Sequence, residues 1–137
     1  MSDPHIDTDV IIRLLTGDDP EKQSAARRLF ESVEAQRLSV SAPDTVIADA
    51  VFVLSSPRLY AQTRAAVAAM LSRLVRLPSF KVAQRQVVLD ALALYSEHNI
   101  DFGDAMVVAS MQHQGSSVLF SYDEDFDRFR AIQRKEP

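Results

Sequence analysis

The chain has 137 residues, no cysteine, a hydrophobic fraction of 47% and a formal net charge of −4. The length suits one domain with a single core, and the lack of cysteine excludes disulfides, thiolate zinc sites and cysteine nucleophiles. The negative charge argues against a protein that coats nucleic acid through bulk positive charge, although basic residues can still cluster on one face.

Apolar residues occur in short runs, and none of these runs is long enough to span a bilayer. The first residues, MSDPHI, lack the basic stretch and the apolar stretch of a secretory signal. We therefore expect no membrane association, a cytoplasmic location and a single domain over residues 1–137.

The first third of the chain is predicted to alternate short strands with helices. A strand over residues 4–7 precedes a helix over residues 9–16, which Gly17 ends. Asp19 and Pro20 are typical of a helix cap and a first helical position. The helix that they begin has four apolar residues on one face: Ala26, Leu29, Phe30 and Val33.

The middle of the chain continues this alternation. Residues 38–42 alternate like a strand, and the next helix runs between Pro43 and Pro57. A longer helix is predicted over residues 59–77, where Pro78 stops it. The helix after Pro43 carries four apolar residues at helical spacing: Val46, Ala50, Val53 and Leu54.

The last third is predicted to hold two strands, two helices, a helical turn and an edge strand in the arginine-rich tail. The strands are predicted at residues 80–82 and 117–120, and the helices at residues 84–97 and 101–114. The helical turn is predicted at residues 123–126. Strands that alternate with helices predict an α/β domain of three α/β/α layers, with a central parallel sheet covered on both faces. Such sheets bind ligands beyond the C-terminal ends of their strands.

Aspartates stand where the predicted elements meet. Asp7 ends the first strand, Asp49 lies inside an apolar helix and Asp104 lies near the start of another. Asp123 follows the strand at residues 117–120. Converging carboxylates would repel one another unless a divalent cation neutralised them, and Mg²⁺ or Mn²⁺ prefers such oxygen ligands. The cation could polarise a phosphodiester and lower the pKa of a water nucleophile.

Each aspartate also has a structural interpretation. Asp7 and Asp104 can cap helices, and Asp123 and Asp125 can serve a turn. Asp49 has no local role in its apolar helix, but a salt bridge to an arginine would satisfy it. The whole set is more specific for a metal site than any single member.

Other residue types give weaker signals. The three glycines are isolated, so they form no phosphate-binding loop, and no Gly-x-Ser-x-Gly motif is present. Two sets are predicted to lie on the surface without a chemical role: the histidines His5, His98 and His113, and the arginines Arg64, Arg73 and Arg76.

Four acidic motifs follow one another along the chain: IDTD at residues 6–9, IADAVFVL at 47–54, DFGDAMVVA at 101–109 and FSYDEDF at 120–126. In order and spacing this series resembles the PIN-domain ribonucleases, and in particular the VapC-type toxins of type II toxin–antitoxin systems. The chain differs from the family pattern at three positions. It has Asp49 where the family commonly has Glu, Asp9 where the family has Asn, and Ser121 where the family has Thr.

The resemblance implies a PIN fold, Mg²⁺-dependent endoribonuclease activity with Mn²⁺ as a substitute, an RNA substrate, a cognate antitoxin protein and a homodimer. It implies an acidic cluster that is both catalytic and metal-binding: Asp7, Asp49, Asp104 and Asp123. Asp101 and Asp125 are further candidates as ligands or supports of a second metal. Thr8 and Ser121 would orient the carboxylates and the phosphate.

Two other functions are compatible with these residues. A degenerate PIN domain would bind RNA or a partner without cleaving, and the change to Asp49 favours it. A haloacid-dehalogenase-like phosphatase would use Asp7 as nucleophile and Asp9 as acid and base, which the Asp-Thr-Asp sequence resembles. That family also needs a lysine after a later strand, and the lysines of this chain are poorly placed for it.

Overall fold

The computed structural model describes residues 2–137. Its helices are α1 (Thr8–Leu15), α2 (Pro20–Glu34), α3 (Asp44–Ser55), α4 (Arg64–Val75), α5 (Arg85–Glu97) and α6 (Phe102–Gln114). Its strands are β1 (Val40–Ala42), β2 (Phe80–Val82), β3 (Val118–Phe120) and β4 (Gln133–Lys135), with a 3-10 helix, η1 (Glu124–Arg128), before β4. None of the helices in the described part is long and apolar enough to cross a membrane.

The strands pair in parallel, in two separate groups. β1 pairs with β2, and β3 pairs with β4. Residues 4–6 extend the first group, because Ser41 accepts from Ile6 N–H at 3.0 Å and donates to the Pro4 carbonyl at 2.9 Å. Helices with parallel strands confirm the predicted α/β class, while the central sheet is not continuous within one chain.

The core of the body (residues 2–114) forms on the helix-covered face of the first strand group. Every second residue of these strands is buried, as the period of a strand requires: Ile6, Val40, Ala42, Phe80 and Val82. Helices bury their apolar stripes against this face, and Ile47, Leu71 and Leu92 are fully buried. Burial of these apolar side chains stabilises the packing of the helices, and so fixes the positions at which α1, α3 and α6 begin.

Most helix ends lie where the sequence predicts them. Asp19 caps α2 by accepting from Lys22 N–H at 3.1 Å, and Gly115 ends α6 with a left-handed φ of 68°. The predicted helix over residues 59–77 was wrong at its start, because α4 begins at Arg64. Ala61 has a left-handed φ of 48° that interrupts a helix, and the Thr63 hydroxyl caps α4 instead.

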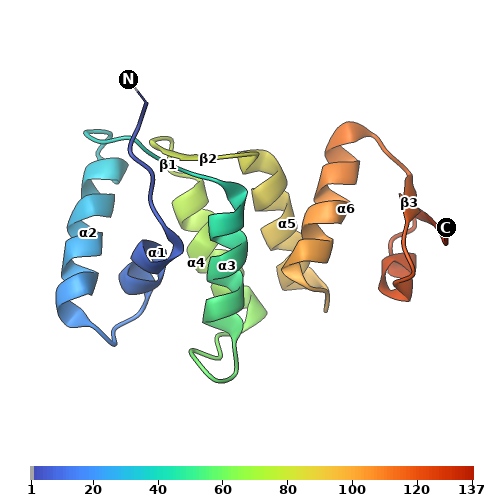
Figure 1. The fold of residues 1–137 in the computed structure, drawn as a ribbon, viewed down its shortest axis with the longest axis horizontal. Helices are drawn as coiled ribbons and strands as arrows, with labels where there is room; N and C mark the ends of the chain where they lie inside the picture. Colours follow the sequence, from blue (N-terminus) through green and yellow to red (C-terminus); the bar gives the residue numbers. More distant parts are fainter. Residues whose placement is uncertain (1) are drawn as a thin grey trace.

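The C-terminal unit (residues 116–137) holds β3, η1 and β4, and it lies at the opposite end of the molecule from α1 and α2 (Figure 1). It is attached to the connection between α5 and α6. Phe126 is buried, the Phe129 ring meets the His98 ring at 5.1 Å, and Arg128 Nη1 donates to the Asn99 carbonyl at 3.3 Å. The second strand group is therefore separated from the first by the helices of the body.

Candidate active site

The N-terminal motif begins where residues 4–6 end and α1 starts. Asp7 is the N-cap of α1, and its Oδ1 accepts from the Thr8 N–H at 2.7 Å. The Thr8 hydroxyl donates to the Val46 carbonyl at 3.5 Å, which joins the start of α1 to the first turns of α3. These bonds fix the backbone of Asp7 close to α3.

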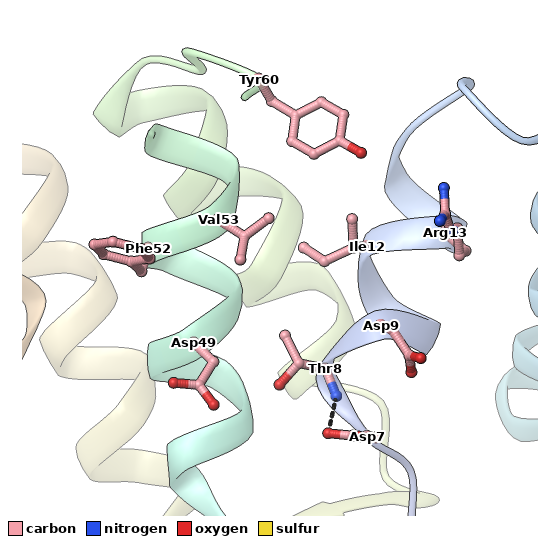
Figure 2. A pocket seen from close by; sticks show the side chains of 9 residues that line it. All are labelled: Asp7, Thr8, Asp9, Ile12, Arg13, Asp49, Phe52, Val53 and Tyr60. Atoms are coloured by element: carbon pink, nitrogen blue, oxygen red, sulfur yellow. Dashed lines mark hydrogen bonds between the residues drawn. The ribbon is translucent and has the colours of Figure 1, made fainter. Parts of the chain in front are cut away.

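Asp49 lies on α3 one turn after Val46 and faces the start of α1. Figure 2 shows Asp49 on α3 and, across from it at the start of α1, Asp7 beside Thr8. Asp7, Asp49 and Arg13 line the same surface hollow, which has a volume of about 500 Å³. The Asp49 side chain is exposed and has no ion-pair partner in residues 2–137, so the salt bridge to an arginine that would give it a structural role is not formed there.

The rim of this hollow is held by a polar network around Asp18. Tyr60 donates its phenolic hydroxyl to Asp18 Oδ2 at 2.6 Å, and Arg13 Nη1 lies 3.3 Å from Asp18 Oδ1. The Thr16 hydroxyl donates to the same carboxylate at 3.0 Å. The bond from Tyr60 is the main reason why the pKa of Asp18 lies below its ordinary value. The network therefore places one cation and one aromatic hydroxyl beside the acidic hollow.

A second group of carboxylates gathers around the start of α6. Asp101 is the N-cap of α6, and Asp104 lies in its first turn. Burial raises the pKa of Asp104, and the negative charges of Asp123, Asp101 and Asp125 raise it further. Asp123 Oδ1 accepts from the Asp125 N–H at 2.9 Å, and the Ser121 hydroxyl accepts from the Asp123 N–H at 3.0 Å. The three neighbouring carboxylates are therefore close enough to disfavour the anionic form of Asp104.

The two acidic groups lie on neighbouring sides of α3. Phe52, which is 73% exposed, lines both the hollow with Asp49 and an adjoining one with Asp101. Within residues 2–137, no three acidic or histidine side chains converge closely enough to enclose a metal ion. The structure therefore brings Asp7 to Asp49, and Asp104 to Asp123, but leaves the six predicted ligands in two groups.

The chemistry of these groups fits a hard divalent cation. Their donors are carboxylate oxygens, and among the described residues five of the six have no basic partner within 4.0 Å: Asp7, Asp49, Asp101, Asp104 and Asp123. Mg²⁺ commonly uses one or two protein carboxylates and completes its shell with water and substrate phosphate. The pair of Asp7 and Asp49 meets that requirement.

Arg64 has a role that the sequence did not indicate. It was predicted to lie on a solvated face, but it is half-buried and its Nη1 donates to the carbonyls of Tyr95, His98 and Ile100, the last at 2.6 Å. Its guanidinium also lies 4.4 Å from the centre of the Tyr95 ring. Arg64 therefore fixes the connection that leads into Asp101. An arginine in a predicted helix gives no signal for such distant carbonyl partners.

Among residues 2–137, no lysine lines the hollow that contains Asp7, whereas the phosphatase alternative requires a lysine beside its aspartates. The PIN-domain family model matches residues 5–132, almost the whole chain. No curated protein matches the chain.

Proposed function

The chain belongs to the PIN-domain family, whose members are generally nucleases, and we propose that it is a divalent-metal-dependent endoribonuclease. We further propose that residues 1–137 form one nuclease domain that acts as the toxin of a toxin–antitoxin pair in the cytoplasm. In this proposal Mg²⁺ is the physiological metal, Mn²⁺ substitutes for it, and the partners are RNA, an antitoxin and a second copy of the chain.

The observation that carries the proposal is the pairing of Asp7 and Asp49 in one open hollow. Their motifs are more than 40 residues apart in the sequence, and the Thr8–Val46 hydrogen bond brings them together. In the part of the chain that the structure describes, no basic side chain within 4.0 Å neutralises either carboxylate. Unneutralised acidic pairs in an accessible hollow favour a bound cation over a purely structural role.

The residues of the hollow have different roles in the proposed hydrolysis of a phosphodiester. Bound at Asp7 and Asp49, Mg²⁺ would polarise the phosphate and lower the pKa of the attacking water. Arg13 is placed to face a phosphate of the RNA, while Asp18 and Tyr60 hold the rim around it. Asp104 and Asp123 are proposed to complete the acidic site. Thr8 and Ser121 position Asp7 and Asp123 through the backbone bonds described above.

Cleavage of single-stranded RNA, measured with Mg²⁺ and with a chelator, tests this proposal. We expect cleavage only with metal, and a loss of about a hundredfold in Asp7→Asn, since one electrostatic contact is worth about 3 kcal/mol. Asp44→Asn is the matched control, because Asp44 begins the same helix as Asp49 and binds Gln84 outside the hollow. RNA binding without metal-dependent cleavage would instead identify a degenerate PIN domain.

A further inference from the structure

The body exposes an unpaired parallel edge at residues 4–6. Pro4 and Ile6 direct their bonding groups towards Ser41 of β1. Because bonding groups alternate along a strand, the N–H and C=O of His5 point to the other side. No strand of the described chain pairs with that side. The strand that would continue the sheet there is missing from the body.

The C-terminal unit exposes a matching edge on β3. Ser117 and Ser121 bond to β4, at 2.7 Å and 3.0 Å, so the bonding groups of Val118 and Phe120 point away from it. The side chains of Val118 and Phe120 are 40% and 67% exposed. An apolar strand with a free edge is a surface that pairs with another strand.

The chain exposes more surface than a compact monomer of its mass, as expected if contacts with a second molecule are absent. The solvent-accessible area is 8126 Å² for 15.3 kDa, whereas a compact monomer of this mass exposes about 7,100 Å². The excess of about 1,000 Å² for one chain is of the order of the roughly 800 Å² that each partner buries in a specific protein interface.

We propose that two copies of this chain exchange their C-terminal units, so that β3 of one copy pairs in parallel beside residues 4–6 of the other. His5 then lies beside Leu119, and the first strand group continues through β3 into β4. In this register Phe120 joins the face of the sheet that contains Ile6, which is 9% exposed in the body core. The exposed ring of Phe120 thereby gains a buried position.

The same register completes the acidic site, which is the part of the inference that rests on the proposed function. Asp7 of one copy comes beside Ser121 of the other, two residues before Asp123. C-terminal ends of parallel neighbours lie at the same edge of a sheet, where ligands bind. Each site would therefore take Asp7 and Asp49 from one copy and Asp123 from the other.

A second copy fits this edge better than closure within one chain. The C-terminal unit already packs on its own body through Phe126, Phe129 and Arg128, and closure within one chain would break these contacts. Only residues 115–117 connect α6 to β3, which is a short hinge of the kind that favours exchange. A two-fold exchange pairs both open edges without moving either unit relative to its own body.

A pair of cysteines tests the exchange independently of any activity. The chain has no cysteine, so His5→Cys with Leu119→Cys introduces the only two thiols. Paired strand neighbours lie about 5 Å apart, within the reach of a disulfide. We expect mild oxidation to give a covalent dimer on a non-reducing denaturing gel, and only monomer from either single variant. A cross-link within the monomer, or none, would overturn the proposal.

Solution mass provides a second readout. We expect a dimer by light scattering, and a monomer for Phe120→Lys, which changes no packing within one chain because Phe120 is exposed there. Leu59→Lys, at an exposed apolar residue away from both edges, is the matched control and should remain dimeric. A monomeric parent, or a dimer that Phe120→Lys leaves intact, would contradict the exchange.

Complementation tests the shared site. Asp7→Asn and Asp123→Asn chains are unfolded together in urea and refolded as a mixture. About a quarter of the parent rate should return, because half of the dimers are mixed and each of these has one intact site. A mixture as inactive as its components, from chains that form the covalent dimer, would overturn the shared site. An inactive parent would refute the proposed function and leave the cross-linking result unaffected.

Discussion

Asp49 and Asp104 each lie among apolar residues of a helix, yet α3 and α6 place them in different surroundings. Asp49 is exposed at a hollow and forms no ion pair within residues 2–137, while Asp104 is half-buried beside three other carboxylates. The α3 side is therefore open before metal binds. The α6 side carries electrostatic repulsion that a cation would relieve. Removing the charge of Asp104 should therefore raise stability while it lowers cleavage. Substitutions of Asp49 should change cleavage with little change in stability.

The largest effect is expected from Asp104→Asn. Cleavage should fall by about a hundredfold or more, while the melting temperature of the metal-free protein should rise, because Asn removes a half-buried charge that neighbouring carboxylates repel. Mg²⁺ should raise the melting temperature of the parent more than that of the variant, since a ligand of the folded state stabilises it. Thermal unfolding with and without millimolar Mg²⁺ measures both. A variant less stable than the parent without metal would contradict the repulsion.

The pH dependence of stability in the metal-free protein should also reflect the Asp104 carboxyl. The raised pKa of Asp104 means that the folded state binds its proton more tightly than the unfolded state does. Its contribution therefore favours folding at low pH and is lost as the pH rises through the raised pKa. The melting temperature of the metal-free parent should consequently fall less steeply below neutral pH than that of Asp104→Asn. Parallel pH profiles would refute this assignment.

An intermediate effect is expected from Arg64→Ala. The variant leaves the carbonyls of Tyr95, His98 and Ile100 without their donor, which should cost about 2–3 kcal/mol of unfolding free energy in urea. Mg²⁺ affinity should also fall, because Asp101 and Asp104 follow this connection, and Arg64→Lys should restore part of both. Arg73→Ala, at an exposed arginine of the same helix, should change stability by less than about 0.5 kcal/mol. Unchanged metal affinity in a destabilised Arg64→Ala would limit Arg64 to a structural role.

The elements of the fold were largely predictable, because local signals determine them. Pro20 and Gly115 mark helix ends through backbone geometry, and residues 80–82 alternate with the period of a strand. The start of α4 was not predictable, because a left-handed Ala61 has no sequence signature. The split into two strand groups also escaped prediction, since strand order depends on contacts between distant segments and not on local pattern.

The candidate site was predictable in its residue types but not in its grouping. Asp7 and Asp49 line the same hollow. The negative charges of Asp123, Asp101 and Asp125 contribute to the raised pKa of Asp104. Motif order indicates such residues without giving their distances. Their assignment as metal ligands stays a prediction that the substitutions above test. The arginines Arg13 and Arg64 were missed because their partners come from other segments.

The smallest effect is expected from Asp49→Glu, which separates the two sides of the comparison most sharply. The PIN-family pattern has Glu at this position, and the side chain lies at an open hollow without an ion pair to any of residues 2–137. One added methylene therefore meets solvent and not packed core, so the melting temperature should change by about a degree or less. Cleavage should be preserved or increase by a few-fold, with tighter Mg²⁺ binding, because the longer carboxylate needs less bridging water to reach the cation. Asp49→Ala should abolish cleavage at similar stability. The rate is measured against Mg²⁺ concentration for the parent and both variants, alongside melting curves. A fully active Asp49→Ala beside a destabilised Asp49→Glu would show that Asp49 is a structural residue and remove α3 from the metal site.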